Sequence, residues 1–148
     1  MSAKVDVLKG LIQQTAYLYS LDLRALPEGK FETSPGGVAR TPQDISSEVA
    51  GFNRLCCALL TDQPAGESGG MVADAAAAEV AVKESSEALL ATIDSLDEDA
   101  LQAKVTAPWG QEMTKFDLAQ MAAINTVYHD GQLNYFQALH GDGEIHWK

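Results

Sequence analysis

The sequence has little cysteine, and what it has cannot build a covalent framework. Cys56 and Cys57 are the only two among 148 residues, and they are adjacent. Neighbouring cysteines do not readily pair with each other, and this pair lacks the spacing of a zinc knuckle or a redox motif. We therefore expect no disulfide scaffold, and a reducing cytoplasm is the simplest compartment for the chain.

Basic residues are also scarce. Lys and Arg together number 10 against 21 Asp and Glu, which gives a formal net charge of -11, and no basic stripe occurs. Phosphate backbones and anionic lipid surfaces would repel such a chain, so we expect no nucleic-acid partner.

Long apolar runs are absent. The first residues interrupt their apolar positions with Lys4, Asp6 and Lys9, which a signal peptide would not do, and no later run approaches membrane-spanning length. We expect a soluble, unprocessed protein without a membrane partner. Its length fits a single domain over residues 1–148.

The motifs that assign chemistry directly are missing too. The sequence contains no H-E-x-x-H, no G-x-S-x-G and no phosphate-binding glycine loop. No histidine follows a glutamate by three residues, which excludes a ferritin-like di-iron centre.

Four stretches do have helical character, and the segments between them contain most of the glycine and proline. Apolar periodicity and start signals predict helices over Ala3 to about Ala25, Thr41 to about Thr61, Val72 to about Ser95, and Thr114 to about His140. A turn is expected at Pro108-Trp109-Gly110, and no alternating run is long enough to predict a strand. The sequence therefore predicts an all-α four-helix bundle.

The last predicted helix has polar residues on the face that should be buried. A rotation of about 100° per residue places Asn125, His129 and Gln132 in one stripe with Leu118, Met121, Ala122, Phe136 and Leu139. Other polar residues of this helix point elsewhere, namely Asp117, Gln120, Asp130, Asn134 and Gln137. Burying an unpaired polar group costs about 1–3 kcal/mol, so we expect the three in the stripe to have partners.

Glu48 is the expected partner on the second predicted helix. It lies in the apolar stripe of that helix, and in antiparallel helices it would reach the height of His129. Two interpretations stay open: the pair is a hydrogen-bonded core contact, or it binds a metal. Asn125 and Gln132 either complete a hydrogen-bond network or line a pocket.

The remaining candidate groups favour structural roles. We interpret Cys56 as a small core residue because no basic residue adjoins it. For His140 and His146, at the end of the last helix and in the tail, complementation of the helix dipole or simple exposure is favoured over ligation.

Three segments resemble the DinB-like family of metal-binding four-helix bundles. TPQDISSEVAGFNRL resembles its second helix, TAPWGQEMTKFDLAQM the turn and entry to its last helix, and NTVYHDGQLNYFQALHGDG its H-x-x-x-H-x-G-Q signature. The resemblance covers most of the chain. It implies an up-down-down-up topology and allows a homodimer.

The resemblance also implies a set of metal ligands. His129 matches the second histidine of the signature, Asn125 stands where the first should be, and Glu48 stands where the second helix has its histidine. The implied ligands of a divalent metal, which would be nickel, zinc, iron or manganese, are thus Glu48, Asn125 and His129, with Gln132 as a cofactor-binding residue. One carboxylate, one amide oxygen and one imidazole should bind more weakly than three imidazoles.

Two functions follow from the resemblance. The first is an interior pocket for a divalent metal or small ligand, related to thiol-dependent transferases in which a metal activates a small-molecule thiol or polarises a substrate. The alternative is a family member without metal or catalysis, in which Glu48 and His129 pair directly and the chain acts by binding or dimerisation. The sequence leaves open whether the protein is an enzyme.

Overall fold

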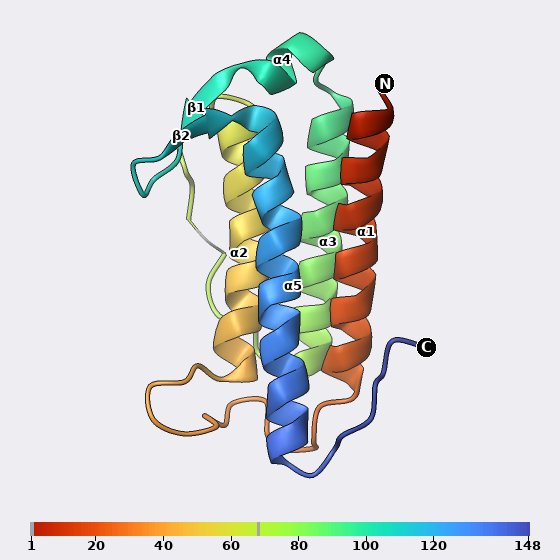
Figure 1. Cartoon of the computed structure of the whole chain (residues 1–148). Coiled ribbons are helices and arrows are strands. Elements are labelled where there is room, and N and C mark those ends of the chain that lie inside the picture. The colour runs from red at the N-terminus through yellow and green to blue at the C-terminus, as the bar shows by residue number, and fades with distance from the viewer. Residues whose placement is uncertain (1, 68) are drawn as a thin grey trace.

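Four long helices form a bundle in the computed structural model, which describes residues 2–67 and 69–148. They are α1 Ala3–Arg24, α2 Pro42–Leu60, α3 Ala75–Asp94 and α5 Lys115–Leu139 (Figure 1). The short helix α4, Glu98–Gln102, lies between α3 and α5. The predicted all-α bundle is confirmed, and only the start of α3 differs from its predicted position by more than one residue.

The prediction that the chain forms no strand is wrong for the segment before α5. Strands β1, Lys104–Thr106, and β2, Glu112–Thr114, pair antiparallel across the turn at Pro108-Trp109-Gly110. Three residues per strand are too few for alternation to stand out in a sequence. The ring of Trp109 stacks on that of Phe52 in α2, with centroids 6.1 Å apart, so the hairpin packs against the bundle.

The helix directions follow from which helix ends share a core. One apolar cluster joins the start of α1 to the end of α2, the end of α3 and the start of α5, and contains Val5, Leu8, Cys56, Leu60, Leu89, Ile93 and Leu118. A second cluster joins the opposite ends, with Tyr19, Leu23, Ile45, Val49, Ala78, Val82 and Leu133. Consequently α1 and α5 run in one direction and α2 and α3 in the other (Figure 1).

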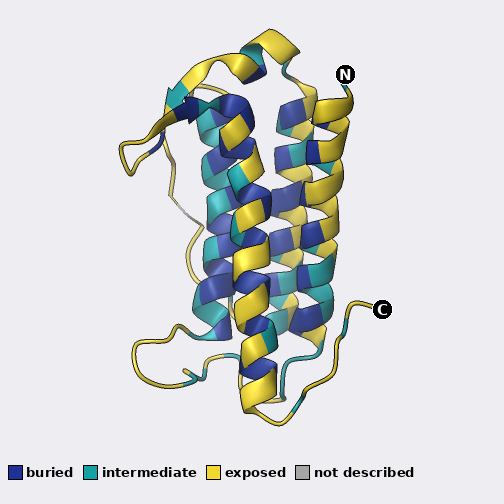
Figure 2. Ribbon diagram, viewed as in Figure 1, coloured by how far each residue is buried: buried dark blue, intermediate teal, exposed yellow. Residues whose placement is uncertain are grey.

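Each of the four long helices packs against two of the others and buries the side that faces them. Both α1 and α2 pack against α3 and α5, and buried residues (dark blue) alternate with exposed ones (yellow) around each of these helices (Figure 2). Cys56 is fully buried in this core, where burial raises the pKa of its thiol to about 12, in agreement with a packing role. Within residues 2–67 and 69–148, no helix is both long and apolar enough to span a membrane.

A complete capping box starts α2, the helix that carries Glu48. The hydroxyl of Thr41 accepts a hydrogen bond from the Asp44 N–H at 3.0 Å, and the Thr41 N–H donates to the Asp44 carboxylate at 3.1 Å. These bonds satisfy amide groups that the first turn of a helix leaves unpaired.

Thr41→Ala should lower the free energy of unfolding by about 1 kcal/mol, because it removes the side-chain half of the box. Thr41→Ser keeps the hydroxyl and should lose much less. Urea denaturation of both variants measures the difference. Equal losses would show that the cap does not stabilise α2.

Candidate functional site

His129 of α5 and Glu48 of α2 are in contact. The His129 ring is 2% exposed, and its Nε2 lies 3.1 Å from Oε1 of Glu48. Its Nδ1 lies 2.6 Å from Oε1 of Gln132, one turn further along α5. The contact agrees with the positions of the two residues on antiparallel helices, whereas their role as metal ligands stays a prediction.

Glu48 has a second partner that the sequence did not indicate. Its Oε2 accepts a hydrogen bond from Nη1 of Arg40, and Nη2 of Arg40 donates to the backbone oxygen of Asp44 at 3.2 Å. Burial opposes ionisation of Glu48, but hydrogen bonds from Arg40 and His129 outweigh it and hold the pKa of its carboxyl below the ordinary value. With a side chain 39% exposed, Glu48 lies at the edge of the bundle, and its predicted interior position is wrong.

Both ring nitrogens of His129 face oxygen atoms. If both oxygens accept a hydrogen bond from the ring, His129 carries a proton on each nitrogen and a positive charge. If the Gln132 amide turns by 180°, its NH₂ group donates to Nδ1 and the ring is neutral. In a third arrangement the one ring proton lies on Nδ1 and is donated to Oε1 of Gln132, which leaves the lone pair of Nε2 facing Glu48.

The other two predicted site residues lie at the rim of the buried face of α5. Asn125 is half-buried, and within residues 2–67 and 69–148 its Oδ1 is a buried acceptor without a hydrogen-bond partner. Gln132 is exposed, and Leu139, placed in the same stripe, is 52% exposed, so both interior placements are wrong. The buried face is centred roughly a quarter turn away, because α5 packs against α1 as well as α2.

Because the buried face of α5 is shifted in this way, a second polar cluster is buried between α1 and α5. Asp22 is fully buried and accepts hydrogen bonds from Asn134 at 3.0 Å, Gln137 at 3.3 Å and the indole of Trp147 at 2.6 Å. Asp130 is also buried and hydrogen-bonded to Asp22; burial and this neighbouring carboxylate raise the pKa of Asp130 to about 8. The spacing of Asp130, Asn134 and Gln137 along one helix face was the signal that could have revealed this cluster.

The remaining histidines have local partners. Nδ1 of His140 donates to the carbonyl oxygen of Phe136 at 2.8 Å, near the end of α5, and His146 pairs with Asp142 at 2.8 Å. Their predicted roles outside the site agree with these contacts.

Glu48, Asn125 and His129 fit a divalent metal poorly. The 3.1 Å between Nε2 and Oε1 would let one ion contact both atoms, and Oδ1 of Asn125 has no hydrogen-bond partner among the described residues. However, the set has one carboxylate, one amide and one imidazole, and the guanidinium of Arg40 beside Glu48 adds a positive charge that repels a cation. In the part of the chain that the structure describes, no three or more His, Cys, Asp or Glu side chains are grouped to hold a metal.

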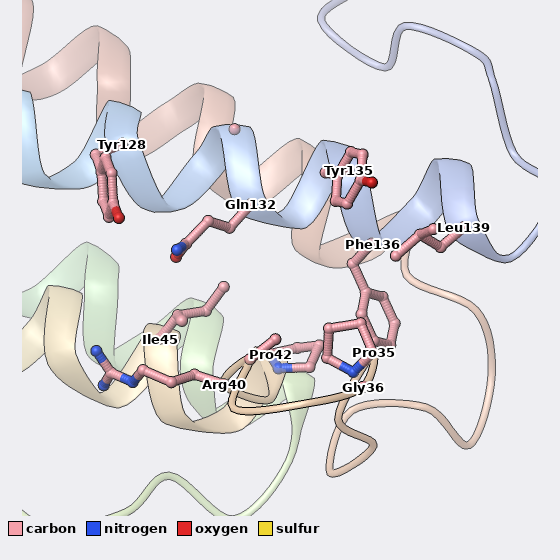
Figure 3. A pocket seen from close by; sticks show the side chains of 12 residues that line it. Pro35, Gly36, Arg40, Pro42, Ile45, Tyr128, Gln132, Tyr135, Phe136 and Leu139 are labelled. Atoms are coloured by element: carbon pink, nitrogen blue, oxygen red, sulfur yellow. The ribbon is translucent and has the colours of Figure 1, made fainter.

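A pocket of about 520 Å³ lies beside the His129–Glu48 pair, between α5 and the segment leading into α2 (Figure 3). Gln132 and Arg40, the outer partners of His129 and Glu48, line it. Its other lining residues are Pro35, Gly36, Ala39, Pro42, Ile45, Tyr128, Gly131, Tyr135, Phe136 and Leu139. Its volume is in the range of small-molecule sites.

Asp130→Asn should flatten the pH dependence of stability. The folded-state pKa of Asp130, about 8, exceeds the unfolded value of about 3.9, so only the native state keeps this proton between these values. The resulting stabilisation is complete below about pH 4 and is lost as the pH rises through 8. Urea denaturation from about pH 5 to 8 should therefore show a larger loss in wild type than in Asp130→Asn. Glu84→Gln, an exposed acid of α3, is the control, and parallel curves for all three proteins would contradict the assignment.

No protein-family model and no curated protein matches the chain. Among solved structures, the crystal structure of a DinB-like protein, YjoA, from Bacillus subtilis is similar, with a TM-score of 0.74 and 14% sequence identity. The match covers 93% of this chain and 94% of that one. Identity this low supports the fold and not the activity. The chain therefore has a DinB-like fold.

Proposed function

We propose that this protein binds a small organic molecule in the pocket between α5 and the segment from Pro35 to Ile45. One observation carries the proposal. Gln132, His129, Glu48 and Arg40 form a continuous series of hydrogen bonds, and its two end members line that pocket. A molecule that forms a hydrogen bond with Gln132 or with Arg40 would therefore change the hydrogen-bond partners of His129 or of Glu48.

The glycine in the pocket wall supports an opening kept for a ligand. Gly131 lies inside α5, where alanine would be favoured by about 1 kcal/mol. A Cβ atom at this position would meet no atom within 4 Å, so packing within the chain does not require glycine. Because Gly131 has no side chain, it leaves space in the pocket between Tyr128 and Tyr135, which also line it.

The geometry supports binding more than turnover. His129 is 2% exposed and does not line the pocket, so a ligand reaches it only through Gln132. Activation of a thiol by a metal would need a bound cation, which the positive charge of Arg40 opposes. A weakly held divalent ion at Glu48, Asn125 and His129 is the second candidate, and the unpaired Oδ1 of Asn125 is the observation in its favour.

A bulky residue at position 131 should close the pocket. We expect the neutral fluorescent probe N-phenyl-1-naphthylamine to bind wild type with one site, and Gly131→Trp to weaken binding at least tenfold, a loss of about 1.4 kcal/mol. Gly131→Ala is the control, which should keep binding and raise the free energy of unfolding by about 1 kcal/mol. If circular dichroism shows that both proteins are folded and they bind the probe with equal affinity, the proposal that this pocket binds the probe is wrong.

Elemental analysis tests the second candidate separately. Protein purified without a histidine tag or chelator should contain far less than one equivalent of nickel, zinc, iron or manganese, because the ligands fit a metal poorly. Stoichiometric metal that is lost in His129→Ala would instead establish the metal site.

A further inference from the structure

The pocket has a charge opposite to that of the protein. Arg40 is the one charged residue among its described lining residues, in a chain whose formal net charge is -11. A pocket lined by a single sign of charge concentrates ligands of the other sign. An anion in the pocket would compete with the carboxylate of Glu48 for Arg40, the one positive charge of the lining.

Arg40 can exchange its present partner at little cost. Its side chain is 44% exposed and that of Glu48 is 39% exposed, and ion pairs this open to solvent contribute about 0–1 kcal/mol. If Arg40 turns to a ligand, Glu48 keeps the hydrogen bond from Nε2 of His129. The exchange therefore leaves no carboxylate stranded, and a guanidinium can bind an incoming carboxylate or sulfonate through two parallel N–H groups.

The rest of the pocket is apolar and aromatic. Figure 3 shows Arg40 and Tyr128 toward one end and Pro35, Phe136 and Leu139 toward the other. Ile45 and Phe136 are buried, so they present a fixed apolar surface to the space between the ends. A matching molecule has an anionic group at one end and an apolar body at the other.

We propose that the pocket binds an amphipathic organic anion, whose carboxylate or sulfonate pairs with Arg40 and whose aromatic or aliphatic body packs against Ile45, Phe136 and Tyr135. The proposal rests on the proposed function, since it names the ligand class for the same pocket. Tyrosine rings also attract organic cations, but Arg40 in the same pocket repels them. The sign of charge is therefore what an experiment must decide.

Two probes with the same aromatic body isolate that charge. The probe 8-anilinonaphthalene-1-sulfonate carries a sulfonate, and N-phenyl-1-naphthylamine lacks it. We expect wild type to bind the sulfonate about tenfold more tightly, as one charge-assisted pair of about 1.4 kcal/mol predicts. Arg40→Met should remove this preference and leave the affinity for the neutral probe within about twofold.

The chain offers a matched control and a second variant with the opposite effect. Arg24 also pairs with a glutamate, Glu79, but does not line this pocket, so Arg24→Met should change neither affinity. Glu48→Gln removes the carboxylate that competes for Arg40 and should raise the affinity for the sulfonate severalfold. Stronger binding in one variant and weaker binding in the other cannot result from loss of folding.

The outcomes separate this inference from the proposed function. If both probes bind equally and Gly131→Trp abolishes both, the pocket exists but the anion inference is overturned. A preference that survives Arg40→Met, or tighter binding of an amine derivative of the same body, overturns it as well. If neither probe responds to Gly131→Trp, the proposed function and this inference both fail.

Discussion

The hydrogen bond between Nε2 of His129 and Oε1 of Glu48 is the contact on which the site depends. A histidine that is 2% exposed needs partners for both nitrogens, and it finds one on each side of the α2–α5 interface. Glu48 is in turn oriented by Arg40 and His129 by Gln132. These outer residues face the pocket, so the contact that satisfies the buried ring also links it to a surface that a ligand can reach.

The chain has a DinB-like fold. The structural similarity extends over 93% of the chain at 14% identity, which shows that the two proteins share the arrangement of their helices. Where the sequence resemblance implies three histidines, the chain has a carboxylate, an amide and one histidine, and the guanidinium of Arg40 adds a positive charge beside them. The hydrogen-bonded series Gln132, His129, Glu48 and Arg40, with the pocket beside it, gives each of these polar side chains a partner. A metal site would need stronger ligands than this set supplies.

The sequence predicted the helices and one half of the site for clear physical reasons. Capping residues and clustered glycine and proline mark helix ends locally, and periodicity placed Glu48 and His129 within reach. The buried face of α5 was misplaced because two neighbouring helices, not one, define it. Arg40 precedes the cap of α2, outside any periodic pattern, and Asp22 meets Trp147 across most of the chain, so neither contact could be found locally.

The most direct test of the account is the ¹⁵N spectrum of the His129 ring during titration with 8-anilinonaphthalene-1-sulfonate. The signal is assigned by its loss in His129→Gln. We predict a protonated Nε2, perturbed by Glu48→Gln, and a shift that saturates as the probe fills the pocket. An Nε2 that lacks its proton because it binds a metal, or a ring signal unchanged at saturating probe, would contradict the coupling of the pair to the pocket.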